Sequence, residues 1–281
     1  MNVFSIGASR NIGYHAARRL LAKGATVTFL LRSTSVFDNN QEIQAHIRAG
    51  TARLVKGDAL KAEDGAKDGT IDLVIFTVGG LPSFQMTKGF LVNPPNLCAQ
   101  SFLNLVITMP ASLRRPSAQP RFIAVSSIGL SHAAHAELPL LLKPLYGYAL
   151  HQPHADKLAM EWVIAHCAGW EWAHETPTGI LSADWTSLPG LPAFGELEHV
   201  VGIRAALLTS GACKADKKKN GKVPYRQKDC ELGDGYTISR EDVAHYFVEG
   251  LMLHWDQWEG KWAHIAYWMT IRKDLEPTDR L

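Results

Sequence analysis

A short run of small and polar residues near the start of the chain has the spacing of a phosphate-binding loop. Gly7 and Gly13 bound it, and between them stand Ala8, Ser9, Arg10, Asn11 and Ile12. Glycines let the backbone approach a pyrophosphate, and the N–H groups that open a following helix point at the anion. An apolar run at 3–6 precedes the loop, and helical spacing follows it. This strand–loop–helix context predicts dinucleotide binding, and the alternative is a tight turn without a ligand.

Basic residues follow the second apolar run, 25–31, which ends at Arg32 and Ser33. In dinucleotide-binding folds an acidic residue at this place binds the ribose 2′-hydroxyl, whereas an arginine suits a 2′-phosphate through charge-assisted, forked contacts. Arg10 adds a second guanidinium inside the loop. The sequence therefore favours NADP(H) over NAD(H), and the alternative is a surface arginine that merely ends a strand.

Two further predicted strands end in residues suited to a ligand. Asp58 and Ala59 follow the run 52–55, and Val78, Gly79 and Gly80 end the run 71–78. Ligands of open parallel sheets bind outside the carboxyl ends of the strands, so we expect these residues to line the adenine and ribose side of the cofactor. The alternative for Asp58 and for the glycines is a turn without a ligand.

The elements that must position these residues alternate along the chain. Apolar patterns predict strands at 3–6, 25–31, 52–55, 71–78 and 121–125, with helices after Gly13 and at 41–48, 99–109 and 154–167. This alternation predicts an α/β fold with a doubly wound parallel sheet. A sixth strand is predicted at 179–181.

The remainder of the chain is less regular, and we expect one domain, 1–281, in which 185–281 forms a small irregular lobe on the substrate side. The basic run 214–222 is short and lacks interleaved aromatic residues, which is typical of a solvated loop rather than a nucleic-acid site. Ser239 stands three residues before Asp242, ahead of an apolar stripe, and this spacing predicts a capped helix.

Composition narrows the class of partner. The formal net charge is +2, which is too small to indicate a nucleic-acid or membrane-surface partner. The four cysteines form no metal-binding or redox pair, and the twelve histidines present no ligand set, so no metal is expected. No signal peptide or membrane span is evident. We therefore expect a cytoplasmic monomer or homodimer that acts on a small molecule.

The loop from Gly7 to Gly13 resembles the cofactor loop of short-chain dehydrogenase/reductases, with Asn11 where that family usually has its middle glycine. Tyrosine-dependent members carry a Tyr-x-x-x-Lys pair after a serine that ends the fifth strand. Here Ser126, Ser127 and Lys157 match, but Pro153 takes the place of the tyrosine. The tyrosine hydroxyl protonates the developing alkoxide in those enzymes, so their carbonyl reduction cannot be carried over unchanged.

Three stretches, 153–161, 169–172 and 238–244, are similar instead to the atypical branch of this superfamily, which includes NmrA-like proteins and flavin/biliverdin-IXβ reductases. The resemblance implies that Ser126 or Ser127 and His154 flank the nicotinamide. It also implies that Lys157 holds the nicotinamide ribose, with a solvated helix lysine as the alternative.

The proton donor has several candidates. His154 is the first, as an imidazolium or through a bound water, and the alternative is that it only caps a helix. Tyr148 is the next, and Tyr146 and His151 precede the same helix.

Two functions follow from these observations. The first is an NADPH-dependent reductase that transfers hydride to a small aromatic or conjugated acceptor, for which Trp185 would line the pocket. The second is a non-catalytic NADP(H) sensor of NmrA-like type. The missing tyrosine favours the sensor, whereas the retained serine, lysine and nearby histidine favour the enzyme.

Overall fold

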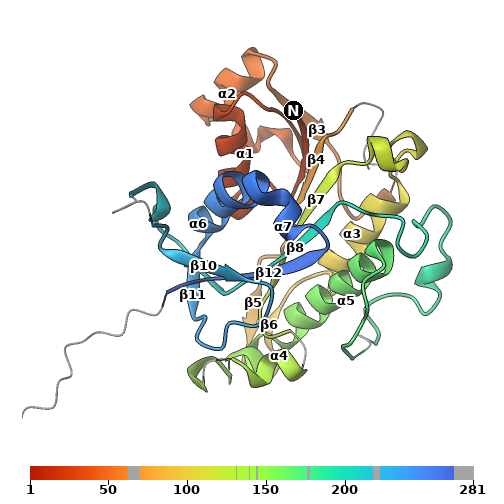
Figure 1. The fold of residues 1–281 in the computed structure, drawn as a ribbon, viewed down its shortest axis with the longest axis vertical. Coiled ribbons are helices and arrows are strands. Elements are labelled where there is room, and N and C mark those ends of the chain that lie inside the picture. The colour runs from red at the N-terminus through yellow and green to blue at the C-terminus, as the bar shows by residue number, and fades with distance from the viewer. Residues whose placement is uncertain are drawn as a thin grey trace, which may run out of the picture.

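The computed structural model describes residues 1–62, 70–130, 132–138, 140–143, 145–175, 178–217 and 222–268. At its centre lies an eight-stranded sheet with the order β10-β12-β8-β7-β4-β1-β2-β3 (Figure 1). Its strands are β1 (Asn2–Ile6), β2 (Thr26–Leu31), β3 (Ala52–Lys56), β4 (Leu73–Phe76), β7 (Arg121–Ser127), β8 (Val200–Ala205), β10 (Tyr225–Lys228) and β12 (Lys261–Tyr267). All neighbours are parallel except β10, which runs antiparallel to β12.

Helices cover both faces of this sheet. They are α1 (Asn11–Ala22), α2 (Gln41–Arg48), α3 (Leu97–Ile107), α4 (His132–Ala136), α5 (His151–Ala168), α6 (Arg240–His245) and α7 (Trp255–Trp258). Buried residues of α1 and α6 share one apolar core, and those of α3 and α5 share another (Figure 1). Successive strand residues such as Val3 and Phe4 enter opposite cores, which explains why the strands read as continuous apolar runs. The predicted doubly wound parallel fold is confirmed.

The strand predicted at 179–181 is wrong. Gly179 has φ +73° and belongs to a turn, a conformation incompatible with an extended strand. The sixth parallel strand is β8, followed in the sheet by β12. Gly202 interrupts the apolar pattern of β8 for a physical reason: a Cβ there would lie 1.9 Å from Cε3 of Trp262 on β12. The expected division into a core and a lobe from 185 stays a prediction.

Two short sheets complete the fold. The hairpin β5 (Ser83–Gln85) and β6 (Gly89–Leu91) follows β4, and β9 (Leu207–Thr209) pairs in parallel with β11 (Thr237–Ser239). Ser239 caps α6 as predicted, accepting from the N–H of Asp242 at 3.0 Å. Among the residues of these ranges, no helix combines the length and apolar character that a membrane span requires.

Asp242 itself has a structural role. Its carboxylate accepts from the N–H groups of Lys214 and Ala215 at 3.1 and 2.8 Å and from the Ser239 hydroxyl at 2.7 Å. The motif at 240–242 therefore fixes the turn around 214 to α6.

Candidate cofactor and active site

The loop after β1 packs directly on the end of β4. Gly7 has φ +82°, and a Cβ there would lie 2.6 Å from the backbone nitrogen of Val78. A Cβ on Gly13 would lie 2.3 Å from Oγ1 of Thr77. β1 pairs with β2 on one side and with β4 on the other, so this loop lies at the point where the strand order reverses. Open α/β sheets bind ligands in the crevice at that point, and the predicted loop occupies it.

Asn11 explains how the loop dispenses with its middle glycine. It has φ 58° and is the one non-glycine residue in the described ranges with a positive φ. Asparagine tolerates this left-handed conformation better than other side chains do. Arg10, exposed and extended, precedes α1, and no side-chain cap from the described residues and no first-turn acid serves the start of this helix. The first N–H groups of α1 are thus suited to a pyrophosphate, as a dinucleotide requires.

Arg32 and Ser33 are exposed directly after β2. The register pairs Ile6 with Leu30, so the glycine loop and the residues that follow β2 leave the sheet at the same edge. The Ser33 hydroxyl lies 2.6 Å from that of Ser35. The selectivity of this arginine for a 2′-phosphate stays a prediction.

A small cavity lies beyond the same strand ends. It is lined by Ile6, Leu30, Ala59, Lys61, Ser101, Asn104 and Leu105. The Asn104 amide donates to the Ala59 carbonyl at 2.9 Å, while the N–H of Leu60 donates to Asp58 at 3.1 Å. The Ser101 hydroxyl is buried without a partner among the described residues. The volume of this cavity is about 10 Å³, room for no more than one water, so these residues would have to move apart before an adenine ring could enter.

Ser101 and Asn104 were not predicted as site residues, because they lie on a helix and not at the end of a strand. Their signal was present as two polar residues on the buried face of an otherwise apolar helix.

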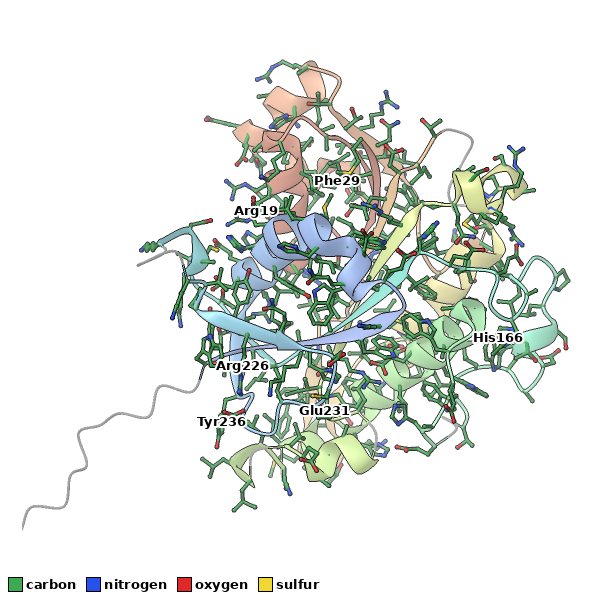
Figure 2. All side chains as sticks on the ribbon, viewed as in Figure 1. Arg19, Phe29, His166, Arg226, Glu231 and Tyr236 are labelled. Carbon is green, nitrogen blue, oxygen red and sulfur yellow. The ribbon has the colours of Figure 1, made fainter. Side chains whose placement is uncertain are left out.

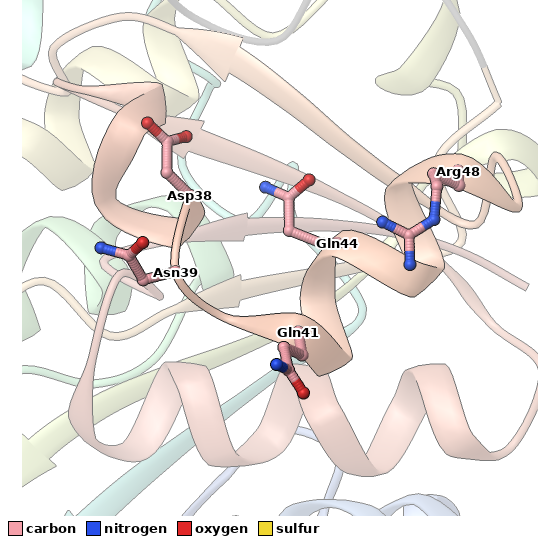
Figure 3. Close-up of a pocket in the computed structure, with 5 residues that line it drawn as sticks. All are labelled: Asp38, Asn39, Gln41, Gln44 and Arg48. Carbon is pink, nitrogen blue, oxygen red and sulfur yellow. The ribbon is translucent and has the colours of Figure 1, made fainter.

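A wider pocket of about 740 Å³ lies elsewhere, between α2 and the 3₁₀ turn Thr34–Phe37. Its lining is polar, from Asp38, Asn39, Gln41, Gln44 and Arg48 (Figure 3). No residue of the glycine loop or of the strand ends lines it. The pocket therefore takes no part in the site.

Lys157 joins the ends of β4 and β7. Its ammonium donates to the carbonyls of Val78 at 3.0 Å and Val125 at 2.8 Å, so the alternative of a merely solvated lysine is wrong. The preceding residue, Asp156, accepts from the N–H of Cys98 at 2.8 Å and thereby fixes α5 to the start of α3. An ammonium has three protons, and one remains for a ligand beside these carbonyls. The predicted contact with the nicotinamide ribose uses that third proton.

The two serines at the end of β7 differ in what their hydroxyls contact. Ser127 donates to the Ile128 carbonyl at 3.2 Å. Ser126 is 4% exposed, and its Oγ has no partner in the described part of the chain. Side chains alternate along a strand, so Ser126 faces the same side as Phe122 and Ala124, toward α5. Of the two serines, only Ser126 has a hydroxyl without a hydrogen-bond partner in the described part of the chain.

The glycines after β4 also separate by role. A Cβ on Gly80 would lie 2.1 Å from Cγ1 of Val92, so this glycine allows the hairpin segment to pack closely. Gly79 is exposed, and a Cβ there would meet no atom within 4 Å. Gly79 is therefore the one of the pair that leaves space for a ligand.

The candidate proton donors are less available than the sequence suggests. Burial, together with the nearby His135 and His151, lowers the pKa of His154 to about 4, so its ring is neutral at neutral pH rather than an imidazolium. α5 begins at His151, which also excludes His154 as the helix cap. The Tyr148 hydroxyl donates to the carbonyl of Met86 on the hairpin turn. The side chain of Tyr146 lies outside the described residues.

Comparison with known proteins agrees with this geometry. Residues 7–186, more than half of the chain, match the model of a family described as NAD(P)H-binding. The chain belongs to this NAD(P)H-binding family. Its cofactor is accordingly NAD(P)H.

Curated relatives carry oxidoreductase names. The chain is 28% identical to reductase pytE of Aspergillus terreus over 202 residues, which cover 70% of this chain and 67% of that protein. It is 23% identical to oxidase pynE of Aspergillus niger, over 91% of each chain.

Solved structures share the fold. The anaerobilin reductase ChuY of Escherichia coli has a TM-score of 0.54 at 16% identity, over 99% of this chain and 100% of that one. The oxidoreductase ylbE of Lactococcus lactis has a TM-score of 0.57 at 13% identity, over 96% and 92%.

Proposed function

We propose that the protein is an NADPH-dependent reductase that transfers hydride to a small aromatic or conjugated acceptor, acting in the cytoplasm as a monomer or homodimer. The observation that carries this proposal is the buried, unpartnered hydroxyl of Ser126, one residue beyond the carbonyl that Lys157 holds. The names of its reductase relatives agree with this assignment.

Each group then has a defined task. Gly7 and Gly13 let the loop pack on the end of β4. The amides of α1 bind the pyrophosphate, and Arg32 with Arg10 binds the 2′-phosphate. When bound, the cofactor supplies the hydride from its nicotinamide ring. Ser126 Oγ donates to the acceptor oxygen and polarises it.

The proton comes from one of two sources. The neutral ring of His154 orders a water that donates it, or Tyr148 turns its hydroxyl from Met86 to the acceptor.

The second candidate is a non-catalytic NADP(H) sensor, which specific contacts favour. Two protons of Lys157 and the proton of Tyr148 are engaged by backbone carbonyls, and His154 is neutral. A sensor needs no acid in its site.

Titration of tryptophan fluorescence with NADPH, followed by NADPH consumption with flavins, quinones and conjugated carbonyls, separates the two functions. The reductase predicts saturable binding and turnover of at least one acceptor class. Saturable binding with no turnover by any class would favour the sensor.

A further inference from the structure

A buried guanidinium lies on the strand next to Ser126. Arg204 on β8 is 8% exposed, and its Nε and Nη2 donate to the two carboxylate oxygens of Glu161 on α5 at 3.1 and 2.6 Å. The guanidinium also stacks over the ring of Trp262 at 4.8 Å. These contacts hold it in one orientation, because a bidentate pair and an aromatic face together leave it little freedom.

The opposite side of this guanidinium meets a second carboxylate. Oε1 of Glu231 lies 3.6 Å from Nη1 of Arg204 and 3.1 Å from Nε2 of His264. His264 is 2% exposed, so two deeply buried groups that can donate converge on one oxygen. Nε2 of His174 also approaches Nη2 of Arg204, at 3.4 Å. In this arrangement the position beside Nη1 of Arg204 and Nε2 of His264 is filled by a carboxylate of the protein itself.

Glu231 is held more loosely than Glu161. Its side chain is 23% exposed, and it lies on the irregular segment between β10 and β11, which also contains Gly233 and Gly235 (Figure 2). Its distance to the guanidinium is 3.6 Å, against 2.6 Å for Glu161. A part-buried carboxylate on a glycine-containing loop can leave the site at lower cost than the fully buried Glu161.

The register connects this site with Ser126. Ser126 pairs with Arg204, and Arg204 pairs with His264, across β7, β8 and β12. Adjacent strands lie about 4.8 Å apart, so the side chain of Arg204 leaves the backbone one strand away from the unpartnered Ser126 hydroxyl. A ligand whose anionic group contacts Arg204 would extend toward Ser126 and the end of β4.

We propose that Arg204 and His264 bind an anionic group of the acceptor, a carboxylate or an enolate, and that Glu231 occupies this position until the acceptor displaces it. The identification of the ligand as the acceptor rests on the proposed reductase function, but the anion site does not. Glu231 competes with the ligand. The apparent affinity for the ligand is the intrinsic affinity multiplied by the fraction of molecules in which Glu231 has left the site.

Calorimetric titration of the NADP⁺-saturated protein with naphthoate, and with the neutral naphthamide, tests the proposal. Glu231→Gln removes the competing charge and is expected to tighten naphthoate binding about tenfold, while naphthamide binding is unchanged. Arg204→Lys keeps the charge but not the planar fork, and is expected to weaken naphthoate binding about tenfold. Glu171→Gln, which removes a carboxylate from an exposed residue outside this cluster, is the matched control and should change neither.

Opposite effects of the two variants are the expected signature. If Glu231→Gln weakens naphthoate binding, or if naphthoate and naphthamide bind alike to it, the anion site is overturned. Tight naphthoate binding without turnover of any acceptor would retain the site and overturn the reductase. Turnover of acceptors without a preference for anionic ones would retain the reductase and overturn the anion site.

Discussion

The carboxyl edge of the sheet has two halves that differ in which atoms line them, the backbone at β1 and β2 and side chains at β7, β8 and β12. At β1 and β2 the backbone forms the site: glycines at 7 and 13 permit close approach, and Asn11 adopts φ 58°. At β7, β8 and β12 buried side chains form it, with Arg204 between two carboxylates. Backbone amides bind any pyrophosphate, whereas a side-chain cluster selects a particular group. We therefore propose that the first half serves the shared cofactor and that the second half determines which acceptor binds.

The largest effect on stability is expected in the half at β7, β8 and β12, which is formed by buried side chains. Glu161→Gln leaves Arg204 buried without its bidentate partner and is expected to lower the free energy of unfolding by about 3 kcal/mol. Glu42→Gln is the matched control, because its pair with Arg18 is equally short, 2.7 against 2.6 Å, but exposed. We expect less than about 0.5 kcal/mol there. Urea unfolding of both variants measures the difference. Equal losses of unfolding free energy would contradict the claim that the buried pair contributes more to stability than the exposed one.

The next prediction concerns the half at β1 and β2, where the backbone of the glycine loop lies close to the end of β4. Gly7→Ala places a Cβ 2.6 Å from backbone atoms of Thr77 and Val78, and is expected to abolish NADPH binding and to destabilise the protein by about 3 kcal/mol. Gly24→Ala has a nearly identical φ, +81°, with nothing within 4 Å, and should cost only the strain of about 1 kcal/mol. Thermal unfolding with NADPH titration compares them. Similar losses in both would show that φ alone, not close approach, explains Gly7.

Cofactor selectivity is expected to reside in one side chain. Arg32→Ala should weaken NADPH binding by about 1.5–3 kcal/mol, the usual size of a charge-assisted contact, and leave NADH unchanged. Arg53→Ala, an exposed arginine on β3, serves as the control. Fluorescence titration with both nucleotides gives the answer, and an equal loss for NADH would mean that Arg32 does not contact the 2′-phosphate.

The smallest effect concerns the middle residue of the loop. Asn11→Ala puts a less tolerant side chain at φ 58° and should cost about 1 kcal/mol of unfolding free energy. Asn11→Gly should be neutral within a few tenths. Chemical denaturation distinguishes the two, and a larger loss for glycine would show that the asparagine side chain itself is needed.

The same contrast explains what could be predicted from the sequence. The glycine loop and the strands β1, β2, β3, β4 and β7 follow local patterns, because one strand, one turn and one helix carry all the requirements, whereas the short hairpin of β5 and β6 was not predicted. β8 escaped prediction because Gly202 accommodates a tryptophan sixty positions later. Five residues that are far apart in the chain come together here. The strand register aligns Ser126, Arg204 and His264, while Glu161 comes from α5 and Glu231 from the segment after β10. The neutral state of His154 likewise depends on burial that no local pattern reveals.

Comparison of Ser126→Ala with Ser127→Ala tests the central claim most directly. The two serines are neighbours, and of the two it is Ser126 whose hydroxyl has no hydrogen-bond partner among the described residues. NADPH consumption is measured with the best acceptor of the panel, with NADPH affinity determined for each variant. We predict that Ser126→Ala lowers turnover about a hundredfold at unchanged NADPH affinity, whereas Ser127→Ala stays close to wild type. Equal turnover in the two variants would contradict the assignment of the acceptor to this edge of the sheet.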